Sequence, residues 1–344
     1  MESKLIKNIN AYPVLRQRFM EYISGVNVLP EGYTKEKLFW DYIDVRRHNP
    51  GRRVSMSEYM IFGFYDLSYL EQQAYLTDVE ATLMMRPYNG QAEKYLKDKV
   101  CFLRAFPEFV HRDWLYLPEA SEAEFRSFAE KHPVMALKPQ SSSWGIGFKK
   151  LNTAEAGDLG ALYAELAEKG YLAEEFLTSD PELAAYHPAS LNTLRIITMR
   201  SGYRFTAFGG GLRVGNNGRS VDNAHGGGIF CEIDPASGTI ITDGLDEFGN
   251  VYLSHPVTGV SFRGNTVPLW DEAVELCREA SKKLDCLRVV GWDVAVLPGG
   301  RLELIEGNHN PGMNIVQAPA KHGVRGKFSS MLGDYFSGVT EDMQ

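Results

Sequence analysis

Two acidic residues and an amide towards the C-terminal end of the chain are the strongest candidates for metal chemistry. They lie in the segment VVGWDVAVLPGGRLELIEGN, where a Pro-Gly-Gly turn separates two strand-like runs and predicts a β-hairpin. If the loop centres on Gly299 and Gly300, Asp293 faces Glu306 across the hairpin, and Asn308 lies on the same face. Opposed carboxylates repel each other unless a cation lies between them, and Mg²⁺ prefers oxygen ligands of this kind.

The register of this hairpin decides whether the two acids meet. With the loop centred in this way, Ala295 faces Leu304 on the same side as the acids. A shift of one residue pairs Asp293 with Ile305 instead and leaves the acids on the surface. The hairpin taken alone therefore favours a metal site and an acidic surface hairpin equally.

A lysine at the end of a predicted strand is the second candidate. Residues 134–137 form a short apolar run that ends at Lys138 and continues, after Pro139 and Gln140, as the loop SSSWGIG. The ammonium group of such a lysine, together with the backbone N–H groups of a Ser/Gly loop, suits a phosphate. The loop matches neither the Walker pattern nor the dinucleotide fingerprint, so an ordinary surface turn stays the commoner explanation of the loop alone.

The segment GYLAEEFLTSDPE is the third candidate. Glu174 and Glu175 interrupt its apolar strand, which could present backbone groups to an adenine edge, with Glu182 near ribose hydroxyls. Taken alone, the segment is more typical of an ordinary strand end.

Helices and sheets have to position these groups. The first 130 residues carry apolar side chains three and four apart, which predicts packed helices. Thr153 and Asp271 are expected to cap two further helices. From about residue 190 to Gly264, glycine-rich turns separate strand-like runs, which predicts an antiparallel sheet with long loops. We therefore expect a largely helical region 1–130, a central part 131–188 with the lysine loop and the adenine segment, and a C-terminal part 189–344 with the glycine-rich sheet and the metal hairpin.

Composition narrows the classes of function. With 344 residues, the chain is long enough for two to three domains of about 150 residues. Its 36 basic and 44 acidic residues give a net charge of −8, which argues against a nucleic-acid partner bound by bulk charge. Neither a signal peptide nor a membrane span is evident, and we expect a cytoplasmic protein. The scattered cysteines are expected to be reduced thiols: Cys101, Cys231, Cys277 and Cys286.

In their order along the chain, these pieces resemble the ATP-grasp superfamily. More narrowly, the stretches YLKDKVCFLRAF, VMALKPQSSSWGIGF, HPASLNTLRIIT, GGLRVGNNGRSVDNAHGGG, HPVTG and GWDVAVLPGGRLELIEGNHNPG resemble the sugar-transfer-associated ATP-grasp group, found near polysaccharide and natural-product genes. The resemblance covers about residues 90–315. It implies an α+β ATP-grasp fold, in which two α+β subdomains grip ATP, preceded by a mostly helical N-terminal region.

The resemblance also implies roles for individual residues, with ATP and two Mg²⁺ ions as cofactors and Mn²⁺ as a substitute. Asp293, Glu306 and Asn308 match the metal ligands, and Arg195 and Arg213 are the candidates to neutralise the transferring phosphoryl group. The residues expected to contact ATP are Lys99, Lys138, Ser141, Ser142, Ser143, Gly145, Gly147, Glu174, Glu175, Phe176, Leu177 and Glu182.

A few further polar residues keep two explanations. Asn192 and Asn223 either hold substrate or phosphate, or cap turns, and His225 beside three glycines is a weaker candidate for substrate contact. His187 and His255 each precede a proline, where a structural role is expected.

The activity implied by the resemblance is ATP-dependent ligation of a small-molecule carboxylate to an amine, such as an amino acid, a peptide or an amino sugar. It would pass through an acyl phosphate and release ADP and phosphate, in natural-product or polysaccharide modification. An ATP-grasp phosphotransferase and a nucleotide-binding scaffold without turnover are the alternatives. No pattern in the sequence names the acid, the amine or the oligomeric state.

Overall fold

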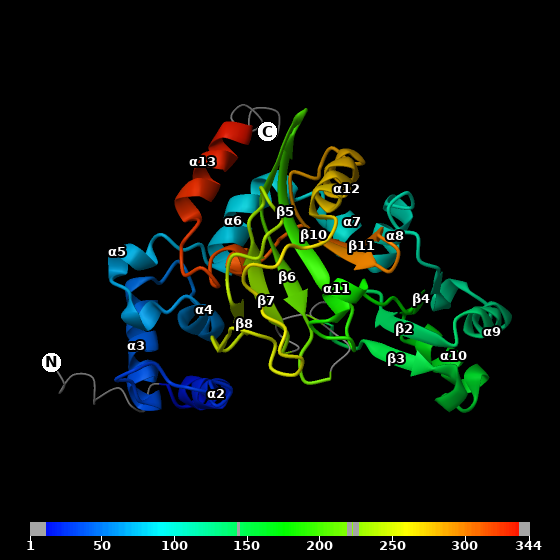
Figure 1. Cartoon of the computed structure of the whole chain (residues 1–344), viewed down its shortest axis with the longest axis horizontal. Coiled ribbons are helices and arrows are strands. Elements are labelled where there is room, and N and C mark those ends of the chain that lie inside the picture. Colours follow the sequence, from blue (N-terminus) through cyan, green and yellow to red (C-terminus); the bar gives the residue numbers. More distant parts are fainter. Residues whose placement is uncertain (1–11, 143–144, 219–221, 223–226, 337–344) are drawn as a thin grey trace.

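The computed structural model describes residues 12–142, 145–218, 222 and 227–336. Within these residues the strands form a seven-stranded sheet and a four-stranded sheet, here called the large and the small sheet. Figure 1 shows the large sheet in the middle of the molecule, with helices α2–α5 at one end and the small sheet at the other. This arrangement confirms the expected α+β class with helices at the N-terminal end.

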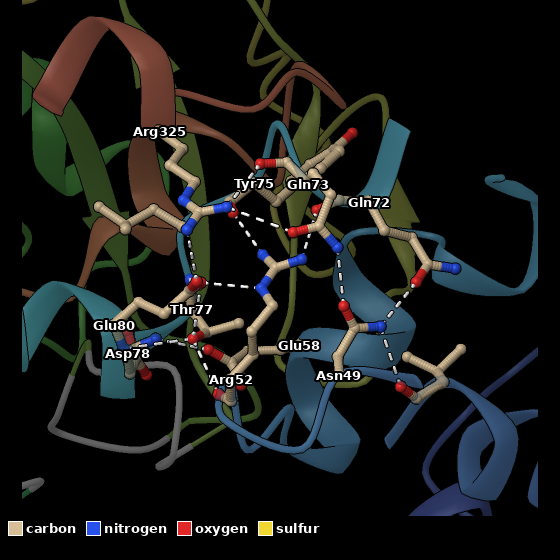
Figure 2. Close-up of polar contacts among 12 residues, drawn as sticks. Asn49, Arg52, Glu58, Gln72, Gln73, Tyr75, Thr77, Asp78, Glu80 and Arg325 are labelled. Atoms are coloured by element: carbon tan, nitrogen blue, oxygen red, sulfur yellow. Dashed lines mark hydrogen bonds and ion pairs between the residues drawn. The ribbon is translucent and has the colours of Figure 1, made fainter. Parts of the chain in front are cut away.

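The N-terminal region is helical, as the spacing of its apolar residues predicts. Its elements are α2 (Pro13–Ile23), α3 (Lys35–His48), α4 (Met56–Ile61), η2 (Phe64–Asp66), α5 (Tyr69–Gln72), α6 (Asp78–Asn89), α7 (Glu93–Leu96) and α8 (Lys99–Ala105). Capping boxes begin α4, α5 and α6, so local hydrogen bonds set where these helices start. Figure 2 shows the polar contacts that join this region to the C-terminal helix α13 (Arg325–Phe336), through Arg325, Glu80 and Arg52.

The small sheet has the strand order β1-β4-β2-β3 and is antiparallel throughout. Helices α9 and α10 pack on it around Phe125, Leu137 and Leu166. Its elements are β1 (Trp114–Tyr116), η3 (Leu117–Glu119), α9 (Glu122–Lys131), β2 (Val134–Pro139), β3 (Lys149–Asn152), η4 (Thr153–Glu155), α10 (Leu159–Glu168), β4 (Tyr171–Glu175) and, after the sheet, α11 (Pro181–Ala184).

The predicted start of α10 is wrong. Thr153 opens the short 3₁₀ turn η4, and the helix begins only after Gly157, which turns the chain at a φ of +66°. The side chain of Asp158 caps α10 by accepting from the N–H groups of Gly160 and Ala161.

The large sheet has the strand order β11-β10-β5-β6-β7-β8-β9 and is also antiparallel. Its elements, with the two that pack on its faces, are β5 (Thr193–Ser201), β6 (Arg204–Val214), β7 (Ile229–Ile233), β8 (Gly244–Leu245), β9 (Val251–Tyr252), α12 (Trp270–Lys282), β10 (Val289–Leu297), β11 (Arg301–Asn308) and η6 (Met313–Val316). α7, α8 and α12 cover one face, and η6, α13 and helices α2–α6 cover the other. Within the described residues, no helix has both the length and the apolar character of a membrane span.

The start of α12 also differs from the prediction, since Asp271 lies in its first turn and does not cap it. Leu269, in the left-handed region at a φ of 56°, precedes the helix, which begins at Trp270. Asp271 still suits this place, because the helix dipole favours an acid in the first turn.

Glycines on β6 let η6 lie directly on the large sheet. A Cβ atom at Gly209 would lie 2.7 Å from Val316, and one at Gly211 would collide with Ile315. Because η6 follows β11 closely in the chain, this packing fixes the segment that leaves the β10–β11 hairpin.

Candidate functional site

The hairpin of β10 and β11 places Asp293 directly opposite Glu306, as the sequence predicts. Asn308 faces Gly291 and lies on the same side as the two acids, because alternate residues of a strand share a face. Two carboxylates and one amide oxygen form a donor set of hard oxygens, which fits Mg²⁺. Within the described residues no group of three or more His, Cys, Asp or Glu could hold a metal ion, so a site here needs the amide as its third protein ligand.

Nearer the turn, the predicted pairing is wrong. Val294 faces Leu304, and Ala295 faces Glu303. Ile305 is an extra residue in β11, a β-bulge, and it shifts the register by one between the turn and the acids. Each of the two registers considered from the sequence therefore holds on one side of the bulge.

Two arginines from neighbouring strands bind Asp293. Arg195 donates from Nε to Oδ1 and from Nη2 to Oδ2, at 2.5 and 3.1 Å, and Arg213 donates from Nη1 to Oδ2 at 3.1 Å. Arg213 also donates from Nη2 to Asp222 at 3.0 Å, and Asp222 accepts from the N–H of Thr193. Sequence reasoning missed Asp222, although it lies in the Val-Asp-Asn stretch that supports the resemblance.

The two acids of the hairpin differ in their electrostatics. Burial raises the pKa of Asp293, but the charges of Arg195 and Arg213 outweigh it and hold that pKa at about 2. Burial and the charge of Asp293 raise the pKa of Glu306, and the arginines oppose this only in part. A cation between the acids would relieve the remaining repulsion, which is a second reason why the residues fit a metal.

The charged groups of the site line up across the large sheet. Glu306, Asp293, Arg195 and Gly211 are successive cross-strand partners on β11, β10, β5 and β6, so they share one face. Gly291 makes room for this row, since a Cβ there would lie 3.3 Å from Cδ of Arg195. The glycine thus lets the arginine side chain pass over β10 to reach Asp293.

The two predicted phosphate lysines bind other groups of the protein. Lys138 donates from Nζ to Glu174 at 2.7 Å, and Lys99 donates from Nζ to the carbonyl and hydroxyl oxygens of Ser142 at 2.5 and 3.1 Å. Burial lowers the pKa of Lys99, and it lies close enough to Glu306 and Glu174 for both to act on that pKa in the opposite direction. Lys99 therefore interacts electrostatically with Glu306 on β11 and with Glu174 on β4.

The adenine segment lines a small cavity of about 50 Å³. Burial raises the pKa of Glu174, but Arg112 and Lys138 outweigh it and lower that pKa to about 2. Sequence reasoning missed Arg112, which is buried and also lines the cavity. The cavity is further lined by Lys138, Glu174, Glu175, Phe176, Leu177 and Ile305.

The remaining predicted nucleotide residues lie around this cavity or away from it. Glu182 is exposed in α11 and does not line the cavity. In the loop between β2 and β3, Ser141 is exposed and Ser142 half-buried. Gly145 and Gly147 have φ values of +70° and +79°, which favour glycine. Ser143 lies outside the described residues, as do Asn223 and His225.

His187, His255 and Asn192 brace loops, in agreement with the structural role expected of the histidines. His255 donates from Nε2 to the carbonyl of Gly215 at 2.9 Å, and its Nδ1 accepts from the N–H of Val257. Asn192 donates from Nδ2 to the carbonyls of Leu183 and His187.

Comparison with models of known protein families identifies one family for this chain. Residues 156–331, just over half of the chain, match the family described as sugar-transfer associated ATP-grasp. A comparison with curated proteins found no match.

Solved structures similar to this chain include an ATP-grasp ligase, a synthase and a synthetase. The ligase PsnB in complex with a minimal precursor is 15% identical, with a TM-score of 0.46 over 71% of this chain and 63% of that one. The N5-carboxyaminoimidazole synthase of Aspergillus clavatus, in complex with ADP and its ribonucleotide, is 14% identical, with a TM-score of 0.39 over 64% and 46%. D-alanyl-alanine synthetase A of Vibrio cholerae is 10% identical, with a TM-score of 0.43 over 73% and 67%. The chain spans less than two thirds of the length of the first two.

Proposed function

The chain belongs to the sugar-transfer-associated ATP-grasp family, and we propose that it is an ATP-dependent ligase that joins a carboxylate to an amine. A carboxylate oxygen of the acid attacks the γ-phosphorus of ATP, and ADP leaves. The amine then attacks the acyl carbon, phosphate leaves, and an amide forms. Since the family is described by its association with sugar transfer, an amino sugar is one acceptor to test.

The observation that carries this proposal is the meeting of two opposed carboxylates with two arginines and a lysine-lined cavity. Asp293 and Glu306 lie on one face of the large sheet, and Arg195 and Arg213 bind the first of them. Lys99 lies within electrostatic reach of Glu306. Phosphoryl transfer depends mainly on such positioned charges, with little covalent chemistry from the protein.

In this proposal, each group of residues has one task. The hinge Glu174–Leu177 holds the adenine, and its cavity of about 50 Å³ has to widen for a purine, because pockets that hold small ligands have volumes of about 300–1,000 Å³. Lys99 donates to phosphate oxygens in place of its present acceptors, and Lys138 keeps Glu174 while its remaining N–H groups donate to phosphate. Mg²⁺ held by Asp293, Glu306 and Asn308, as two ions for which Mn²⁺ can substitute, would neutralise negative charge on the phosphates.

Arg195 and Arg213 have the central task at the reacting group. Their guanidinium groups already meet at Asp293, from two adjacent strands. Fixed donors of this kind stabilise charge that develops on a transferring phosphoryl group, because they need no rearrangement during the reaction. We therefore assign both arginines to the oxygens of that group.

Product analysis tests the proposal. The protein is incubated with ATP, Mg²⁺ and pooled amino acids, peptides and amino sugars, and nucleotides are separated by chromatography, with Glu306→Gln as the control. ADP, free phosphate and a new amide mass are expected. AMP as the main product would contradict the γ-phosphoryl mechanism. ADP with phosphate retained on a stable product would identify a phosphotransferase, and binding without turnover a scaffold.

A further inference from the structure

One buried arginine outside every sequence motif touches both halves of the site. Arg112 lies before β1 and is 4% exposed. Its guanidinium donates from Nε to Glu174 on β4, and from Nη1 to Glu303 on β11, both at 2.9 Å. It also donates to the backbone carbonyls of Leu304 at 2.9 Å and of Ile305 at 3.0 Å. Its acceptors thus come from the small sheet and from the metal hairpin.

The two carbonyls that Arg112 binds belong to the bulge of β11. At a bulge, the extra residue interrupts the regular ladder, and its backbone groups need other partners. In β11 the extra residue is Ile305, and Arg112 supplies the donors at Ile305 and at the residue before it. Without the bulge, the register set at the turn would pair Asp293 with Ile305 and direct Glu306 to the opposite face.

The guanidinium of Arg112 is linked to Lys138, the lysine proposed to bind nucleotide, through the carboxylate of Glu174. Glu174 accepts from Arg112 and from Lys138, so its position depends on both cations. On the other side, Glu303 is fully buried and accepts from the N–H of His111 as well as from Arg112. The result is a chain of alternating charges, Lys138–Glu174–Arg112–Glu303, that runs from the cavity to the hairpin.

We infer that Arg112 is a positioning residue. It holds the bulge of β11 that brings Glu306 opposite Asp293, and through Glu174 it fixes the position of Lys138 relative to this hairpin. This inference rests on the proposed nucleotide and metal site and deepens it. Arginine is required because Nε, Nη1 and Nη2 all donate, and the single ammonium group of lysine cannot span these acceptors. Because a buried ion pair is by itself weak evidence for stability, we assign this network to geometry.

Metal and nucleotide binding test the inference without turnover. Mn²⁺ affinity is measured by calorimetry in the presence of a non-hydrolysable ATP analogue, for the full chain and for Arg112→Met and Arg112→Lys. Groups that orient a metal ligand typically change metal affinity about 10- to 100-fold, and both variants are expected to lose affinity in this range. Arg52→Met is the matched control, because Arg52 is a buried arginine that also binds a carboxylate and two backbone carbonyls, away from the hairpin.

A double-mutant cycle separates positioning from general destabilisation. In a Glu306→Gln background, Arg112→Met should cause little further loss of Mn²⁺ affinity, because its effect is exerted through Glu306. An equal loss in both backgrounds, or an equal loss in Arg52→Met, would overturn the inference.

The register of β11 gives a second, independent readout. A crystal structure of Arg112→Met should show the bulge lost or displaced from Ile305, and an unchanged bulge with unchanged Mn²⁺ affinity would overturn the inference. If the unmodified protein bound neither Mn²⁺ nor nucleotide, the proposed function would fail, and the register in Arg112→Met would still decide the role of Arg112. Should Arg112→Met not fold, Glu303→Gln weakens the same chain and is expected to displace the bulge and lower Mn²⁺ affinity.

Discussion

Two buried arginines, Arg52 in the N-terminal helices and Arg112 at the site, make nearly the same contacts with different consequences. Arg52 donates from Nε to Glu80 at 2.9 Å, and from its other nitrogens to the carbonyls of Gln72 and Tyr75 (Figure 2). Arg112 likewise binds carboxylates and two backbone carbonyls. An arginine's own hydrogen bonds therefore do not reveal its role.

The two arginines differ in the further contacts of the groups that accept their hydrogen bonds. Glu80 completes the capping box of α6 and binds Arg325 of α13 at 3.3 Å, so Arg52 ties helices together. The acceptors of Arg112 hold Lys138 on one side and the bulge next to Glu306 on the other. A buried arginine therefore affects the site only if the groups that accept its hydrogen bonds also hold residues of the site.

The largest expected effect is a loss of turnover when either acid of the β10–β11 hairpin is neutralised. Asp293→Asn and Glu306→Gln are each expected to lower turnover by about 10²–10³-fold or more, as removal of a group that stabilises transition-state charge does. Steady-state kinetics at limiting Mg²⁺ measures it. Near-normal rates in both variants at limiting Mg²⁺ would show that these acids are not the metal ligands.

The same two variants are expected to differ in stability. Asp293→Asn leaves Arg195 without its buried partner, whereas Arg213 keeps Asp222, and the free energy of unfolding should fall by about 3 kcal/mol, the lower end for a broken buried pair. Glu306→Gln removes a charge that Asp293 repels, so stability without metal should stay equal or rise. Denaturant titration measures both, and equal losses would contradict the electrostatic account of the pair.

On the other side of the comparison, Arg52→Met should affect stability alone. We expect a loss of about 3 kcal/mol, at the lower end for a broken buried pair, because Glu80 keeps Arg325 as a partner. Affinity for an ATP analogue, measured by calorimetry on the folded protein, should be unchanged. A parallel fall in affinity would remove the distinction drawn between the two arginines.

Lys138→Ala should weaken nucleotide binding by about 1.5–3 kcal/mol, the contribution of a hydrogen bond to a charged group. Calorimetry with an ATP analogue measures this, and Lys169→Ala is the matched control, since Lys169 is an exposed lysine that also pairs with a glutamate. If both variants bound the ATP analogue as tightly as the unmodified protein, Lys138 would have no role in nucleotide binding.

The smallest effect is a dependence of stability on pH, which tests the electrostatics of the site at Glu174. The pKa of Glu174 is about 2 in the folded protein and 4.5 ordinarily, so its stabilisation is complete above pH 4.5 and is lost as the pH falls towards 2. The difference in unfolding free energy between the unmodified protein and Glu174→Gln should therefore shrink over that range. A constant difference would mean that Arg112 and Lys138 do not hold this pKa down.

Local signals in the sequence predicted the parts of this protein that depend on neighbouring residues. The helical N-terminal region and the hairpin turn both follow from interactions over a few residues. The turn alone brings Asp293 to within one position of facing Glu306, and the order of the motifs along the chain was enough for the family. Helix starts near Thr153 and Asp271 were missed where a left-handed residue or a glycine intervened.

Only the tertiary structure decided the register between the turn and the acids, and with it the roles of Ile305, Arg112 and Asp222. Arg112 lies more than 190 positions from the bulge that it binds, and Asp222 reaches Arg213 and Thr193 from a separate loop. No local pattern distinguishes these residues from other charged or apolar side chains. A bulge and a buried ion pair are stable only when distant segments supply their partners, so the sequence alone determined which groups could react and the packed fold determined which of them face one another.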